Sequence, residues 1–229
     1  MCGRKTLSKD IASIITEMDI EDWEAHNYKP NYNIAPNDFS PVIIKDEKKK
    51  AKMMRWGLVP AWSKNEQIGS KMINARLETV LKKPSFSSLV NNRRCIVLAD
   101  GYYEWAKPNN QPYYISDEKN KILPLAGLWT VWQNSNSSTL FTYTVITTTP
   151  TDNIKHIHNR MPLILSHRSM GKWLDYHDFA ISKYLSDIQN EIPNLKFYPV
   201  SKIVNSAENN SIQNIREKKP KDILKLFPS

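Results

Sequence analysis

The second residue of the chain is one of only two cysteines, and it directly follows the initiator methionine in the sequence MCGR. Initiator methionine is commonly removed when the second residue is small. Removal would leave Cys2 with a free α-amine and a thiol on adjacent carbons, groups whose ordinary pKa values are about 7.7–8.0 and about 8.5. An amine attacks an aldehyde to give a Schiff base, and the neighbouring thiol can then close a thiazolidine ring intramolecularly. Cys2 is therefore suited to trapping an aldehyde, although a second residue taken alone is more often incidental.

Two other residues have side chains suited to proton transfer. Glu104 lies among aromatic residues in GYYEW, and apolar surroundings raise a carboxyl pKa toward neutrality, where the group serves as a general acid or base. The alternative is a strand-end glutamate that faces solvent. His158 in HIHNRMP titrates near neutrality and could donate a proton; on chemistry alone His156 is a rival. Because acidic or cysteine partners at ligand spacing are missing, we expect no metal site and no cofactor.

Amide and guanidinium groups lie close to these positions in the sequence. Asn74 in INARLET could hold the N-terminus or a sugar by hydrogen bonds, although an asparagine at an element end is more commonly a cap or turn residue. Three arginines lie within two residues of Cys2, Asn74 or His158, namely Arg4, Arg76 and Arg160. A guanidinium suits bidentate phosphate contacts, but any single arginine could equally be a surface salt-bridge partner.

The overall charge favours a polyanionic partner. Lys and Arg total 32 against 23 Asp and Glu, which gives a net charge of +9 and a pI near 9.4. Nucleic acid is the usual partner of such a basic protein. The runs DEKKKAK and REKKPKD have interspersed acidic residues and are more typical of solvated turns or tails.

Length and patterning predict a single α+β domain over residues 1–229, with a mixed, mainly antiparallel, barrel-like β core and peripheral helices. Helical periodicity covers residues 7–18, with Ser8 as the cap, residues 179–188 and a short closing helix at 222–227. Residues 133–139 form a predicted hairpin loop. Strand-like runs are β-branched, aromatic and bounded by turn residues; they cover 41–46, 51–57, 95–105, 112–117, 124–132, 140–148, 160–165 and 196–204.

The composition and the N-terminus indicate a compartment. No apolar run approaches the roughly 20 residues that span a bilayer, and the N-terminus lacks the pattern of a signal peptide. Two cysteines cannot form a disulfide framework. We therefore expect a cytoplasmic, nucleoid-associated protein with no membrane partner, and nothing in the sequence calls for more than a monomer.

Seven motifs in order resemble those of the SOS response-associated peptidase (SRAP) family: MCGR, NYNIAPN, RWGLVPAW, INARLET, ADGYYEW, HNRMP and VSKIVN. The resemblance runs from Cys2 to about Asn205, and residues 206–229 cannot be aligned. It implies a protein that loses Met1 by autoproteolysis. Through Cys2 it would then cross-link to abasic sites in single-stranded DNA, or at a junction with duplex. The resemblance also identifies the aldehyde that Cys2 would trap, namely the ring-opened sugar of an abasic nucleotide.

The resemblance assigns a role to each matching residue. Asn74 matches the active-site asparagine. Glu104 would accept a proton from the Cys2 amine and assist removal of Met1, and His158 would open the sugar. The three arginines would bind the DNA backbone. Trp56 and Trp62 would line the DNA cleft and could stack on bases, although tryptophan is also a common core residue; Asn33 and Pro36 belong to a second cleft loop. Cys95 is predicted to be a small buried residue, and Tyr102 and Trp105 to be core residues.

Two other functions remain open from the sequence. Cys2, His158 and Asn74 superficially match the Cys–His–Asn set of a thiol peptidase that acts on other proteins. The chain could also be a module that binds single-stranded or modified DNA without covalent chemistry. If the reaction stops at the Schiff base, strand cleavage by β-elimination is expected, so some abasic-site lyase activity accompanies the main prediction.

Overall fold

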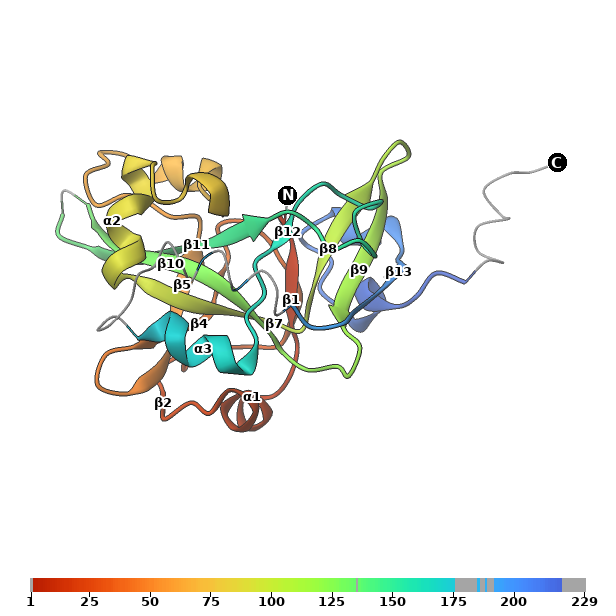
Figure 1. Cartoon of the computed structure of the whole chain (residues 1–229), viewed down its shortest axis with the longest axis horizontal. Coiled ribbons are helices and arrows are strands. Elements are labelled where there is room, and N and C mark those ends of the chain that lie inside the picture. The colour runs from red at the N-terminus through yellow and green to blue at the C-terminus, as the bar shows by residue number, and fades with distance from the viewer. Residues whose placement is uncertain (1, 135, 176–184, 186–187, 189–191, 220–229) are drawn as a thin grey trace.

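Two β-sheets packed side by side make up most of the molecule, with helices at the periphery (Figure 1). This is a computed structural model, and it describes residues 2–134, 136–175, 185, 188 and 192–219. The strands are β1 (Lys5–Leu7), β2 (Asp22–Trp23), β3 (Asn31–Ile34), β4 (Phe39–Lys45), β5 (Lys49–Trp56), β6 (Asn74–Arg76), β7 (Arg94–Ala99), β8 (Gly101–Ala106), β9 (Gln111–Asp117), β10 (Leu123–Gln133), β11 (Thr139–Thr148), β12 (Met161–Pro162) and β13 (Leu195–Pro199).

The larger sheet closes into a barrel. Its strands follow the order β11–β10–β7–β4–β5, and β5 returns to β11 through a parallel pairing. The β10–β11 pair is an antiparallel hairpin, as the polar loop at 133–139 predicts. β7 is buried along its whole length, and after Arg94 its sequence is apolar, as expected of a strand that is covered on both faces. Most pairings are antiparallel, so the predicted α+β class with a mixed barrel-like core is confirmed.

The smaller sheet has the order β13–β9–β8–β1–β3. The predicted strand 95–105 is in fact two strands in different sheets, because Ala99 pairs with Leu123 of the barrel while Gly101 pairs with Thr6 of β1. The chain turns between them at Asp100. A Cβ atom on Gly101 would lie 2.5 Å from the Tyr114 ring, so only glycine fits this crossing. The crossing brings β8, and with it Glu104, alongside β1.

Three α-helices cover the sheets in the described part of the chain: α1 (Ile11–Met18), α2 (Pro84–Asn92) and α3 (His167–Leu174). α1 begins later than predicted, because Asp10 and not Ser8 caps it by accepting from Ser13 N at 2.9 Å. Ser8 instead donates from Oγ to Asp100 Oδ2 at 2.7 Å. The helix predicted at 222–227 and all but two positions of the one at 179–188 lie outside the described residues.

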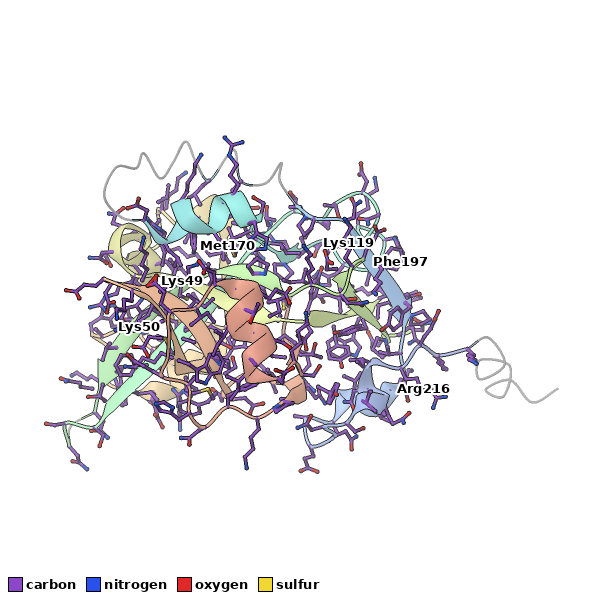
Figure 2. All side chains as sticks on the ribbon, turned by 90° about the horizontal axis from the view of Figure 1, so that it is seen from below. Lys49, Lys50, Lys119, Met170, Phe197 and Arg216 are labelled. Carbon is purple, nitrogen blue, oxygen red and sulfur yellow. The ribbon has the colours of Figure 1, made fainter. Side chains whose placement is uncertain are left out.

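The barrel and the smaller sheet lie toward opposite ends of the molecule. Figure 2 shows Lys49 and Lys50 at the barrel end, and Phe197 and Arg216 at the end formed by the smaller sheet and the C-terminal segment. Short 3₁₀ helices continue the chain after β13, namely η4 (Lys202–Asn205) and η5 (Ile212–Ile215); others are η1 (Glu66–Lys71) and η2 (Leu77–Thr79). Among the described residues, no helix has the length and apolar character needed to cross a membrane.

Candidate active site

Cys2 leads into β1 and lies at the junction of the two sheets. Its side chain is fully buried in the core, in the same cluster as Tyr102 and Tyr143. The pKa of the Cys2 thiol is raised to about 12, mainly by burial and also by the negative charge of Glu104, while the N-terminal ammonium and Lys5 act to lower it. The thiol is therefore held neutral unless a nearby group favours the thiolate.

Asn74 holds the backbone of Cys2. β6, which carries Asn74, pairs in parallel with β11, with Asn74 opposite Val145. The Asn74 side chain donates from Nδ2 to the Cys2 carbonyl oxygen at 2.8 Å. Its Oδ1 is buried and has no hydrogen-bond partner within the described part of the chain. A buried amide oxygen normally has a donor, so Oδ1 is available to a hydroxyl or amine brought to the site.

Glu104 is buried beside the thiol. Only 3% of the residue is exposed, and burial raises the pKa of its carboxyl to about 7. This is the raised pKa that its aromatic surroundings predict. A carboxyl that titrates near neutrality can both accept and donate a proton under cellular conditions.

His158 lies on the loop before β12. Its Nδ1 accepts from the backbone N–H of Arg160 at 3.0 Å, which places the proton of the neutral imidazole on Nε2. Burial holds the His158 pKa below its ordinary value, and the positive charges of the N-terminal ammonium and of Lys107, just beyond β8, act in the same direction. The rival His156 packs its ring against Phe197 of β13, with ring centroids 5.2 Å apart.

Strand pairing brings His158 and Asn74 into the same region. Thr147 of β11 lies opposite Arg76 of β6 and opposite Pro162 of β12. The segments that contain Asn74 and His158 therefore flank the same strand at the same level. Within the described ranges, no three His, Cys, Asp or Glu side chains gather as metal ligands.

The three predicted DNA-binding arginines differ in their present contacts. Arg4 donates from Nη1 to Asn33 Oδ1 at 2.7 Å and to the Val204 carbonyl at 2.9 Å. Arg160 makes a bidentate contact with Glu78, at 2.6 and 3.0 Å. Arg76 is exposed; its side chain makes no hydrogen bond or ion pair with any other described residue. Of the three, Arg76 has the guanidinium most available to a phosphate.

Two residues predicted to line the DNA cleft are buried in this structure. Trp56 is fully buried; it stacks on Tyr143 and donates from Nε1 to the Ile73 carbonyl at 2.9 Å, so its ring has no face for a base. Asn33 is 1% exposed, and its amide donates to the carbonyls of residues 204, 206 and 209. Asn33 therefore anchors the C-terminal segment and does not face a ligand.

The other two predicted cleft residues are accessible. Trp62 is 66% exposed, and Pro36 is half-buried at the turn between β3 and β4. Cys95 and Tyr102 are buried as predicted, whereas Trp105 is only half-buried and donates from Nε1 to Asn205 Oδ1 at 2.8 Å.

Close to Cys2 the structure buries an ionisable residue that the sequence did not indicate. Lys5 follows Cys2 closely and is fully buried. Nothing in the local sequence MCGRKTL predicts that this lysine is buried. Its burial follows from the position of β1 between β3 and β8.

Comparison with known proteins agrees with this geometry. The profile of the SOS response associated peptidase (SRAP) family matches residues 1–207. The chain belongs to the SRAP family. Among its relatives is the abasic site processing protein YoaM of Bacillus subtilis, 38% identical over 225 residues that cover 93% of this chain and 96% of YoaM.

Similarity extends to a vertebrate SRAP protein and to solved structures. The abasic site processing protein HMCES of Xenopus tropicalis is 34% identical over 258 residues, covering 92% of this chain and 76% of HMCES. A solved structure from Bacteroides thetaiotaomicron superposes with a TM-score of 0.84 at 22% identity, over 95% of this chain and all of that one. At that identity the likeness shows a shared fold alone.

Proposed function

We propose that the chain processes abasic sites in single-stranded DNA by trapping them as a thiazolidine on Cys2 after loss of Met1. The observation that carries the proposal is the setting of Cys2: Asn74 holds its carbonyl and the buried Glu104 carboxyl acts on its thiol. Relatives from Bacillus subtilis and Xenopus tropicalis are named abasic site processing proteins. DNA is therefore the partner we assign to this chain.

The reaction requires an amine, an aldehyde and a thiol. The α-amine of Cys2 adds to C1′ of the open sugar, and loss of one water gives a Schiff base. The thiol sulfur then bonds to the same carbon, while the C=N electron pair moves to nitrogen and takes up a proton. The product is a thiazolidine, and its mass is that of the two reactants less one water.

Glu104 and His158 would move the protons. With a carboxyl pKa of about 7, Glu104 accepts a proton from the Cys2 ammonium and makes the amine nucleophilic. The same carboxylate would assist hydrolysis of the Met1–Cys2 bond. His158, with its proton on Nε2, donates to the ring oxygen of the closed sugar and releases the aldehyde.

Binding would use the accessible side chains around the site. Arg76 suits the phosphate beside the lesion, and the exposed ring of Trp62 suits a neighbouring base, where stacking contributes about 1–3 kcal/mol. Schiff-base intermediates that escape ring closure would undergo β-elimination, which accounts for lyase activity as a side reaction.

The test is one incubation. Purified protein is mixed with a uracil-containing single-stranded oligonucleotide pretreated with uracil glycosylase, and the products are resolved on a denaturing gel and by intact mass. We expect an adduct of Met-less protein plus DNA minus one water. Cys2→Ser should abolish it without weakening non-covalent DNA binding, and Cys95→Ala should leave it unchanged. A Cys2→Ser protein that still forms the adduct would rule out the thiazolidine, and retained Met1 with no adduct would favour a non-covalent binding module.

A further inference from the structure

An ion pair ties the loop that carries His158 to the segment that carries Asn74. Arg160, two residues after His158, donates from Nη1 to Glu78 Oε1 at 2.6 Å and from Nη2 to Glu78 Oε2 at 3.0 Å. Glu78 lies in η2, which directly follows β6 and therefore Asn74. Two parallel hydrogen bonds between a guanidinium and a carboxylate fix the orientation of the two groups as well as their distance.

The guanidinium of Arg160 is anchored on a third segment as well. Its Nη2 donates to the carbonyl oxygen of Thr147 and, at 3.4 Å, to Thr147 Oγ1. Thr147 belongs to β11 and lies opposite Arg76 of β6 and Pro162 of β12. Because only 13% of the Arg160 side chain is exposed, water competes little for these contacts. Arg160 thus joins the His158 loop to β11 and to η2.

The backbone of the same arginine holds the imidazole. Its N–H donates to His158 Nδ1 at 3.0 Å, and the hydrogen bond at one ring nitrogen decides whether the other carries the proton. Backbone pairing with β11 begins only at Met161, and His158 and Arg160 lie outside any helix or strand. The side chain of Arg160 therefore restrains the chain where the ladder does not, and a shift at this position would turn the ring.

We propose that Glu78 is a positioning residue, which acts through Arg160 to hold the His158 imidazole in the tautomer and direction that open the closed sugar. This inference rests on the proposed function, in which His158 Nε2 gives its proton to the ring oxygen. The bond from that oxygen to C1′ breaks as the oxygen takes the proton. The C1′ hydroxyl then loses its own proton to water and becomes the aldehyde.

The same carboxylate also occupies the part of Arg160 that would bind DNA. A phosphate presents two oxygens to a guanidinium in the same geometry as a carboxylate, so a bidentate phosphate contact here would require Glu78 to leave. The two roles predict opposite results when the carboxylate is removed. Loss of positioning slows the reaction, whereas release of a masked arginine strengthens DNA binding.

The first measurement follows His158 itself and needs no DNA. The chain has five histidines, and the His158 signals in the NMR spectrum of ¹⁵N-histidine-labelled protein are assigned by their loss in His158→Gln. Glu78→Gln removes the charge and one acceptor oxygen, whereas Arg160→Met removes the guanidinium and keeps the backbone N–H. Glu66→Gln is the matched control, since Glu66 is 51% exposed and pairs with Arg55 at 3.2 Å, while Glu78 is 49% exposed. Thermal melting establishes that each variant is folded.

In the parent protein at about pH 8, where imidazole is neutral, the ¹⁵N shifts should show a bare Nδ1 and a protonated Nε2. In Glu78→Gln and Arg160→Met the two shifts should move toward each other, because the ring then exchanges between both tautomers. Glu66→Gln should match the parent.

The second measurement separates opening of the sugar from capture of the aldehyde. Adduct formation is timed with a saturating abasic oligonucleotide and, separately, with acetaldehyde, which has no ring to open. Glu78→Gln and Arg160→Met should each react with the oligonucleotide roughly tenfold more slowly or worse, and with acetaldehyde at the parent rate. The double variant should be no slower than the slower single variant, because both residues act through one contact.

Three results would overturn the inference, and Glu78→Gln decides each of them even if Arg160→Met fails to fold. Unchanged ¹⁵N shifts would mean that Glu78 does not hold the ring. Equal slowing with both aldehydes would place its effect outside sugar opening. Tighter binding of single-stranded DNA with an undiminished rate would make Glu78 a mask over Arg160. A parent protein that shows the expected shifts but forms no adduct with the abasic oligonucleotide would contradict the proposed function and leave the positioning of His158 by Glu78 standing.

Discussion

At the scale of single residues, Glu104 shows a conflict between stability and chemistry. Its carboxyl has a pKa of about 7 in the fold against an ordinary 4.5, because the ionised form loses its hydration on burial. A group whose pKa is raised on folding destabilises the fold once it ionises. The free energy of unfolding therefore falls as pH rises from about 4.5 to about 7 and stays low above that range.

Glu104→Gln should therefore stabilise the protein and impair its chemistry. Glutamine has nearly the same shape and does not ionise, so at pH 8 the variant should gain up to about 3 kcal/mol in free energy of unfolding. The gain should shrink as the pH is lowered toward 5, and adduct formation should be slowed by roughly 10²-fold or more. Denaturant unfolding at several pH values, with a parallel adduct assay, measures both effects.

Glu78→Gln is the control of opposite sign. Arg160 holds the pKa of the exposed Glu78 carboxyl below its ordinary value, so removing that charge should not stabilise the protein at pH 8. Equal stabilisation of the two variants would mean that a general reduction of negative charge, and not burial at position 104, is responsible.

At the scale of elements, the Asn33 side chain is one of the links between the C-terminal segment and the site. Asn33 of β3 accepts from Arg4 at 2.7 Å and donates to Ser206 and Asn209 carbonyls at 2.8 and 2.7 Å. Ser206 and Asn209, in the segment to which the sequence assigned no role, thus help to hold the asparagine that accepts from Arg4. The segment belongs to the architecture of the site although it does not align with the family motifs.

Asn33→Ala should loosen this connection. The variant removes the three hydrogen bonds that the Asn33 amide donates and the one that it accepts from Arg4, at a cost of about 1–3 kcal/mol in total. The melting temperature should fall by roughly 2–4 °C for each kcal/mol. Scanning calorimetry measures the fall. Asn91→Ala, at an exposed position in α2, is the matched control, and an Asn33→Ala protein as stable as that control would show that the segment is held by other contacts.

The sequence predicted the family and the fold class better than the placement of side chains. The strands and the family motifs followed from local patterns, because alternation and residue type are visible in the sequence. Trp56 and Trp62 lie in one motif, yet one is fully buried and the other 66% exposed; the difference depends on the closure of the barrel by β5 and β11. Likewise, the burial of Lys5 and Asn33 follows from the crossing of β1 between β3 and β8, which no local pattern reveals.

At the scale of the whole molecule, the net charge of +9 favours DNA without selecting a face, whereas a binding site requires particular arginines. Single-stranded DNA binding weakens with salt by a slope of about 0.7 for each phosphate neutralised. Arg76 is exposed, without a salt bridge among the described residues, whereas Arg160 is already held by Glu78 at 2.6 Å. The two should therefore contribute unequally to DNA binding.

Fluorescence anisotropy with an undamaged single-stranded oligonucleotide at several salt concentrations separates these contributions. Arg76→Ala should reduce the salt slope by about 0.7 and weaken binding, Arg160→Ala should have a smaller effect, and Arg168→Ala, on the exposed surface of α3, should have almost none. Each variant removes one positive charge. If net charge governed binding, all three would behave alike, and that result would refute a backbone contact at Arg76; only a site built around Cys2 predicts that they differ in this order.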